Sequence, residues 1–145
     1  MMSAEYDPDN IFAKILRGDI PSHKVHEDDD CIVIMDVMPE SDGHSLVIPK
    51  APSRNILDAD PAVLAKVFAT TQKIAQASMR AFNADGVVIR QFNEPACGQT
   101  VFHLHVHVIP CVTGVPLRRH VGKMEDPAIL AGNARKLVTA LENQV

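Results

Sequence analysis

Hydrophobic residues recur at helical spacing in two long stretches of the chain, residues 64–82 and 130–141. An Asp-Pro pair precedes each stretch, and this pair is typical of a helix start because Asp caps the N-terminus and Pro suits the first turn. A shorter helix is expected over residues 11–17, with Asn10 as its cap and Gly18 ending it in a left-handed conformation. The apolar face of the first long helix predicts packing on a sheet rather than a cofactor site.

Short apolar runs bounded by turn residues predict strands between these helices. They cover residues 24–27, 31–36, 44–49, 87–92 and 102–108. The first two flank an acidic turn and predict a hairpin, and the fourth is expected to pair with the fifth. The chain is therefore expected to form a single α+β domain over residues 1–145. Its sheet has about five mostly antiparallel strands with helices packed on it.

The fifth run contains three histidines at alternate positions, His103, His105 and His107. Strand side chains alternate between faces, so the three imidazoles are expected on one face at steps of roughly 6.7 Å. Burying three hydrogen-bonding rings side by side is costly unless each has a partner, so the row predicts a functional site rather than a structural one. The opposite face, expected to pack on a helix or the core, carries Phe102, Leu104, Val106 and Val108.

Two kinds of chemistry suit a row of imidazoles, a metal site or phosphate chemistry on an imidazole nucleophile. The Gly-Gln-Thr loop at residues 98–100 can turn backbone N–H groups and a hydroxyl towards an anion. A metal site would favour carboxylates or paired thiolates, whereas Glu94 is the one nearby acid and neither Cys97 nor Cys111 has a Cys-x-x-Cys partner. The residues favour a phosphate.

Composition narrows the classes of protein. With 46% hydrophobic residues in 145 positions, one domain can bury a proper core. A net charge of −4 gives no basic surface for nucleic acid. No apolar run approaches transmembrane length, the first residues lack a signal core, and three cysteines do not make a disulfide framework. We therefore expect a cytoplasmic protein that binds neither membranes nor nucleic acid.

The His-Leu-His-Val-His-Val-Ile sequence at residues 103–109 resembles the signature of the histidine triad (HIT) family. Other motifs occur in the order that the family uses, from residue 10 to residue 110, which leaves residues 111–145 as a variable C-terminal tail and helix. The resemblance is strongest to the nucleotide-binding branch, which hydrolyses purine nucleoside phosphoramidates. The matching upstream positions are residues 11–15, 18–21, Asp36, 43–50, Asn93 and 98–100.

This resemblance implies a catalytic role for four histidines. His105 is expected to attack phosphorus and form a nucleotidyl-histidine, and His107 to contact the phosphoryl group and protonate the leaving group. His44 is expected to hydrogen-bond near His103 and fix its tautomer. The residues expected to bind phosphate are Asn93, Gly98, Gln99, Thr100 and His107.

The resemblance also assigns the nucleoside pocket. Asp36 is expected to hold the ribose hydroxyls, although its position also suits the start of a turn. The residues expected to line the base pocket are Phe12, Ile15, Ile34, Val37 and Leu46. By spacing alone, Phe12 and Ile15 would be ordinary core residues.

Many relatives carry a Cys-x-x-Cys pair for structural zinc where this chain has Asn10 and Ala13, so no zinc site is expected and no metal is required. Family members form homodimers with a sheet continuous across both copies, which is the expectation here. Arg118, Arg119 and His120 could reach substrate phosphates or a partner subunit, but a solvated loop is the simpler expectation.

Three alternatives to the phosphoramidase remain at this point. The chain could cleave dinucleoside polyphosphates within the same family. It could be a metal-dependent hydrolase that uses the three histidines, or a nucleotide-binding module without catalysis. The residues leave the leaving group undetermined, because all substrates of this kind share the same α-phosphate.

Overall fold

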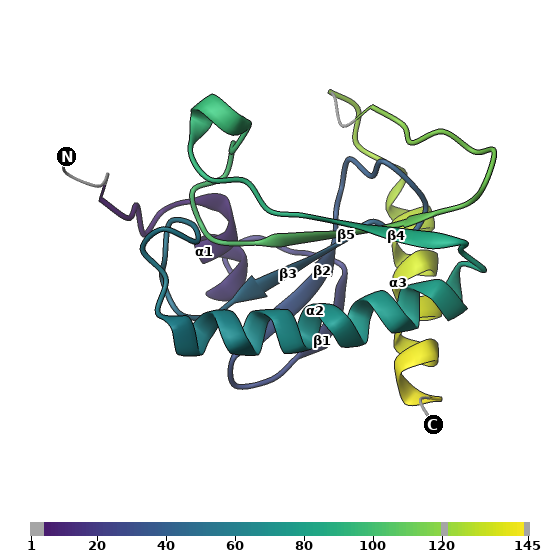
Figure 1. Ribbon diagram of the computed structural model, residues 1–145, viewed down its shortest axis with the longest axis horizontal. Helices are drawn as coiled ribbons and strands as arrows, with labels where there is room; N and C mark the ends of the chain where they lie inside the picture. Colours follow the sequence, from purple (N-terminus) through teal and green to yellow (C-terminus); the bar gives the residue numbers. More distant parts are fainter. Residues whose placement is uncertain (1–4, 120–121, 144–145) are drawn as a thin grey trace.

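The computed structural model describes residues 5–119 and 122–143 and has an open antiparallel sheet with helices on both faces (Figure 1). The strand order is β1-β2-β3-β5-β4, and every neighbouring pair is antiparallel, which confirms the expected α+β class. The elements are α1 Ile11–Leu16, β1 Lys24–Glu27, β2 Cys31–Met35, β3 Ser45–Pro49, α2 Pro61–Ala81, β4 Gly86–Arg90, the 3-10 turn η1 Pro95–Cys97, β5 Val106–Cys111 and α3 Pro127–Glu142.

The two faces of the sheet pack against different helices, because successive side chains of each strand point to opposite faces. Val33 of β2, Val47 of β3 and Val108 of β5 join a core that α2 and α3 complete. Ile34 of β2 and Leu46 of β3 point to the other face and form a smaller cluster with α1. The central strands are therefore apolar on both sides.

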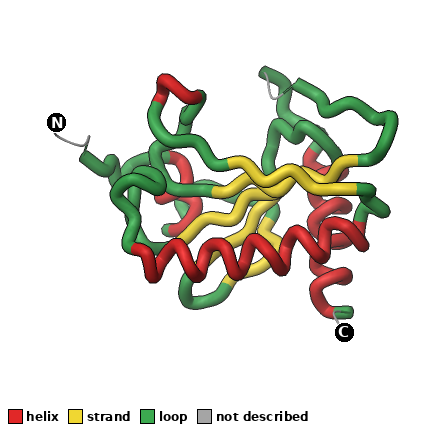
Figure 2. Tube along the Cα trace, in the orientation of Figure 1, coloured by secondary structure: helices red, strands yellow, loops and turns green. Residues whose placement is uncertain are grey.

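The larger core is closed by the two long helices (Figures 1 and 2). Val67 and Ile74 of α2 and Leu137 of α3 are buried against the sheet. Asp60 caps α2 by accepting a hydrogen bond from Ala62, and Asp126 caps α3 in the same way, so both predicted helix starts are confirmed.

On the opposite face, the short helix α1 brings Phe12 onto the sheet. The Asn10 side chain accepts a hydrogen bond from the Ala13 N–H, and Gly18 has φ of +82°, as the predicted caps require. Phe12 is buried against Ile34 and Leu46. Because α1 is only six residues long, it covers part of this face and leaves room for a cleft beside it.

The predicted histidine strand is wrong in its extent. β5 begins at Val106, so of the three histidines only His107 lies in the ladder. In the β3–β5 register Val47 lies opposite Val106, and two positions further Leu104 would face Pro49, which has no N–H to donate. The Leu104 N–H instead donates to the Ser53 carbonyl at 2.9 Å, and the chain leaves the sheet.

A second correction concerns Phe102, which was expected beside Leu104, Val106 and Val108 in the core. The other three are buried there, but the Arg54 guanidinium lies over the Phe102 ring, 4.1 Å from its centroid. This follows from the same departure from the ladder, since Phe102 lies outside the strand and its side chain need not alternate with its neighbours.

Among the described residues, no helix is long and apolar enough to cross a membrane.

We expect Leu137→Ala to lower the free energy of unfolding by about 2–5 kcal/mol, because it opens a cavity in a fully buried site of α3. The matched control is Ile129→Ala in the same helix, whose side chain is exposed and whose loss should cost less than about 0.5 kcal/mol. Urea denaturation measures both. Equal small losses would show that α3 contributes little to the core.

Candidate active site

A cleft of about 500 Å³ lies on the face of the sheet that α1 partly covers. All five residues expected to form the base pocket line it: Phe12, Ile15, Ile34, Val37 and Leu46. Its wall is mostly apolar, as a slot for a planar ring requires. The sequence did not indicate further lining residues, and these include Ile20, Pro21, Met38, Glu40, Phe92, Val101 and Met124.

The predicted catalytic and phosphate-binding residues divide into two groups. Those that line the cleft are Asp36, Gly98, Gln99, Thr100, His105 and His107. His44, His103 and Asn93 are not part of its wall. His44 and His103 are hydrogen-bonded to the cleft residues His107 and His105, whereas Asn93 is hydrogen-bonded to Gln91 and Ile56. The cleft therefore receives two imidazoles rather than the row of three that the strand prediction implied.

His105 presents a nitrogen lone pair to the cleft. Its Nδ1 lies 2.6 Å from the carbonyl oxygen of His103, which can only accept, so in the neutral ring Nδ1 carries the proton and Nε2 is the unprotonated nitrogen. The Phe12 ring meets the imidazole edge to face, with centroids 4.8 Å apart. The backbone carbonyl of His103 thus fixes the tautomer of His105.

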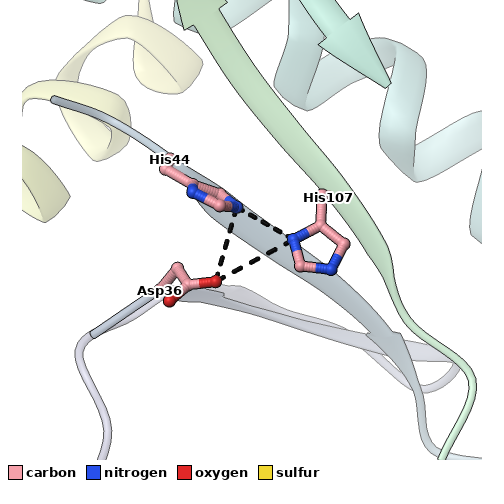
Figure 3. Close-up of side chains that lie close together, drawn as sticks. All are labelled: Asp36, His44 and His107. Carbon is pink, nitrogen blue, oxygen red and sulfur yellow. Dashed lines mark hydrogen bonds and ion pairs between the residues drawn. The ribbon is translucent and has the colours of Figure 1, made fainter. Parts of the chain in front are cut away.

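His107 has the opposite tautomer, which is set by the neighbouring His44 (Figure 3). The Glu40 backbone N–H donates to Nδ1 of His44 at 3.0 Å, so the proton of His44 sits on Nε2. Nε2 of His44 lies 2.9 Å from Nδ1 of His107 and donates to it. Nε2 of His107 therefore carries the proton. The prediction that His44 contacts His103 is wrong, because the β3–β5 pairing places His44 beside His107.

Asp36 completes this buried cluster. Its Oδ1 accepts the Met38 N–H at 2.9 Å, so Asp36 starts a turn, the alternative that its position in the sequence also allowed. Its Oδ2 lies 3.4 Å from Nε2 of His44 and 3.9 Å from Nδ1 of His107 (Figure 3). The carboxylate thus serves the turn through one oxygen and faces two imidazoles through the other.

His103 is almost completely buried outside the cleft. Its Nε2 donates to the Pro49 carbonyl at 2.7 Å, and the Tyr6 hydroxyl lies 2.6 Å from its Nδ1. Burial lowers the pKa of His103 because it disfavours the charged ring, while the hydrogen bond to Pro49 acts in the opposite direction. His103 is therefore a neutral ring that holds its surroundings rather than one that faces substrate.

Two amides that are expected to bind phosphate, Asn93 and Gln99, also hold the loop that carries Gly98 and Thr100. The Gln99 side chain accepts hydrogen bonds from Asn55 and the Glu94 N–H, and it donates to the Arg54 and Val101 carbonyls. The side-chain oxygen of Asn93 accepts the Ile56 N–H at 2.9 Å. Their phosphate contacts stay predictions, whereas their structural contacts are direct.

An ion pair fixes the same loop from outside. Glu94 has φ of +77°, which is strained for a residue with a side chain, and its carboxylate receives two hydrogen bonds from Arg54. These contacts lower the pKa of Glu94 and raise that of Arg54. The backbone around Gly98, with φ of +101°, is thus held in position before any ligand enters.

The histidines of the triad do not converge on one point that a metal could occupy, because both nitrogens of His103 are engaged and Nδ1 of His105 faces a carbonyl. Among the described residues, the donor atoms that do gather belong to Asp36, His44 and His107 and lie within 4.8 Å of one another. At the predicted position of a zinc-binding cysteine pair, Asn10 caps α1 and Ala13 is buried. Those two side chains do not fit zinc.

The C-terminal tail reaches the cleft through Met124, a contact that no local pattern signals. The Glu125 N–H donates to the Val37 carbonyl and the Arg118 N–H to the Glu40 carbonyl, which ties the tail to the rim. The Arg118 side chain pairs with Asp42 and does not line the cleft. Arg119 is exposed, and His120 lies outside the described residues.

Residues 17–114 match the HIT domain family, and this range includes both cleft histidines and the loop before them. The chain belongs to the histidine triad family. Among relatives of this HIT protein is the adenylylsulfatase HINT3 of Arabidopsis thaliana. It is 36% identical over 132 residues, which cover 87% of the chain and 67% of the relative.

Solved HIT structures share the fold at full length. A Hit-like protein of Bartonella henselae, involved in cell-cycle regulation, is 51% identical, with a TM-score of 0.88 over 94% of this chain and 99% of that one. A zinc-bound histidine triad protein of Mycobacterium smegmatis is 35% identical, with a TM-score of 0.83 over 92% of this chain and 94% of that one.

Folding stability should depend on the titration of His103. Because burial lowers its pKa in the folded state, the unfolded chain binds the proton more readily, and the free energy of unfolding should fall as the pH drops below about 6.5. Urea denaturation across this range measures the slope. His103→Gln should flatten it. Identical slopes in His103→Gln and the wild type would contradict the assignment.

Proposed function

We propose that this HIT protein hydrolyses adenosine 5′-phosphoramidates or related purine nucleotides at the α-phosphate through a nucleotidyl-histidine. The observation that carries the proposal is the pair of opposite tautomers at the cleft. His105 offers a lone pair and His107 an N–H, with ring centroids 5.1 Å apart. One ring is thus set to attack and its neighbour to donate. The likeness to an adenylylsulfatase supports the choice of an adenylyl substrate.

The cleft offers a place for each part of such a nucleotide. The base would lie among Phe12, Ile34 and Leu46, where apolar walls exclude water. The ribose would lie over Asp36, whose carboxylate can accept from two vicinal hydroxyls. The α-phosphate would then face the two imidazoles, beside the backbone and hydroxyl of Thr100.

The reaction would proceed in two displacements. Nε2 of neutral His105 attacks phosphorus and the P–N bond breaks, while the departing nitrogen takes the proton from Nε2 of His107. Water then attacks the nucleotidyl-histidine, His105 leaves, and a proton returns to Nε2 of His107. Throughout, the His103 carbonyl holds the proton on Nδ1 of His105 and stabilises the positive ring of the intermediate.

This scheme requires no metal. A metal-dependent hydrolysis stays the second candidate, because Asp36, His44 and His107 offer three buried donor atoms that gather at the cleft wall. The hydrogen bond from His44 to His107 explains without a metal why these two donor atoms lie close together, because a proton lies between them. A chelator separates the two.

The family resemblance implies a homodimer with a continuous sheet, and we further propose that the two copies join through β4. β4 is an edge strand, so one side of it has main-chain groups without a strand partner in the described fold. Ile89 of β4 and Phe68 of α2 are both exposed large apolar side chains. A continuous sheet across a homodimer would cover this edge.

His105→Ala should lower kcat/KM for adenosine 5′-phosphoramidate by about 10³-fold or more, because the nucleophile is lost. The wild type, quenched during turnover, should carry an adenylyl group on His105 that intact-mass spectrometry detects. His26→Ala, a surface histidine on β1, is the matched control and should keep wild-type values.

The same assay run with a chelator decides between the two candidates. Activity that survives metal removal but disappears in His105→Ala supports the covalent route. Activity that chelation abolishes, and that zinc restores, would move the chemistry to Asp36, His44 and His107. Near-wild-type turnover by His105→Ala would refute the proposed nucleophile.

Asp36→Asn should raise KM for the ribonucleotide about 10-fold, because a charged acceptor for two hydroxyls is lost. The 2′,3′-dideoxy analogue lacks those hydroxyls, so its KM should differ by less than about twofold between the two proteins. Steady-state kinetics on the four combinations gives the coupling. Equal effects on both substrates would mean that Asp36 acts on His44 and His107 and not on the ribose.

A further inference from the structure

Tyr6 is the single tyrosine of the chain and lies before α1, outside the residues that match the family. Its hydroxyl oxygen is 2.6 Å from Nδ1 of His103, although 97 positions separate the two residues. The Tyr6 ring also meets the imidazole nearly edge to face, with centroids 5.6 Å apart. The mechanism proposed above leaves this contact without a role.

The direction of this hydrogen bond follows from the other side of the ring. Nε2 of His103 faces the Pro49 carbonyl at 2.7 Å, and a carbonyl oxygen can only accept, so Nε2 carries the proton. In the neutral ring, which burial favours, Nδ1 is then an acceptor. The Tyr6 hydroxyl therefore donates to it, and both nitrogens of His103 are satisfied.

His103 needs such fixing because it lies outside the sheet. β5 begins at Val106, so no strand ladder holds the backbone of residues 103–105. The Leu104 N–H donates to Ser53 and the Leu104 side chain lies in the larger core, while the His103 ring is held between Pro49 and Tyr6. The carbonyl of His103 is the group that accepts from Nδ1 of His105 at 2.6 Å.

We propose that Tyr6 is a positioning residue for the nucleophile: by holding the His103 ring, it places the His103 carbonyl that fixes the reactive tautomer of His105. This inference rests on the proposed function of His105. Tyr6 itself does not line the cleft. Its loss should therefore slow attack by His105 without changing how the nucleotide binds.

The first test is Tyr6→Phe, which removes the hydroxyl and keeps the ring. In single-turnover experiments with adenosine 5′-phosphoramidate, the rate constant for adenylylation of His105 should fall about 3- to 10-fold, the value of one neutral hydrogen bond. The dissociation constant of AMP should change by less than about twofold, because the cleft wall is intact.

Arg17→Gln is the matched control for a merely anchoring role. The Arg17 guanidinium donates to the Pro8 carbonyl at 2.6 Å and so ties down the same N-terminal segment without touching His103. If Tyr6 acts through His103, Arg17→Gln should keep the wild-type adenylylation rate. If Arg17→Gln slows adenylylation as much as Tyr6→Phe does, the positioning role is refuted.

The second test observes the imidazoles directly by ¹⁵N NMR of labelled histidines. Tyr6→Phe should move the Nδ1 resonance of His103 towards that of an acceptor without a donor and should perturb Nδ1 of His105. Because Tyr6 is the single tyrosine, growth on 3-fluorotyrosine modifies this position alone. The more acidic phenol is a stronger donor and should shift Nδ1 of His103 in the opposite direction.

The outcomes separate this inference from the proposed function. Wild-type adenylylation and wild-type ¹⁵N shifts of His105 in Tyr6→Phe would overturn the inference while leaving the proposed function standing. A wild-type protein that forms no adenylyl-His105 would overturn the function, and the NMR shifts would still decide whether Tyr6 sets the tautomer. Should Tyr6→Phe fail to fold, the fluorotyrosine protein carries the test, since its hydroxyl and ring remain.

Discussion

The site depends on one hydrogen bond, from Nδ1 of His105 to the carbonyl oxygen of His103. An imidazole has two nitrogens, and only the one without a proton can attack. By occupying Nδ1, the carbonyl leaves Nε2 as a lone pair. Without this contact, the two tautomers would compete and the ring would turn.

The neighbouring ring, His107, has the opposite tautomer because of two further hydrogen bonds. A backbone N–H of Glu40 determines the proton position in His44, and His44 determines it in His107. An acceptor and a donor thus stand side by side in a cleft although both are histidines. Asp36, with one oxygen on the Met38 N–H, places its other oxygen beside His44 and His107.

The fold makes such contacts possible because helices cover the two faces of the sheet to different extents. One face is closed by α2 and α3 and supplies most of the core. The other is covered only in part by the short α1, so an apolar wall and two imidazoles remain accessible. The loop before β5 is held by Gln99 and by the Arg54–Glu94 ion pair, so its backbone is ordered in advance of ligand binding.

The sequence by itself determined the local structure of this protein. The helical and alternating patterns predicted the three α-helices and five strands of the described residues, although the fifth strand was placed too early in the chain. The Asp-Pro pairs and Asn10 marked helix starts, because caps and periodicity act over a few neighbouring residues. The same patterns, read with the family resemblance, placed the five apolar wall residues and the two cleft histidines, His105 and His107, at one site.

The tertiary structure alone decided which groups meet across long stretches of chain. His44 contacts His107, 63 positions away, and not His103, because the β3–β5 register brings those two together. Because Pro49 has no N–H, the β3–β5 ladder stops at Val106 and does not include His105. This constraint comes from β3 and not from the sequence around the histidines. Tyr6, Met124 and the Gln99 hydrogen bonds are likewise set by packing, which a local pattern of residues does not encode.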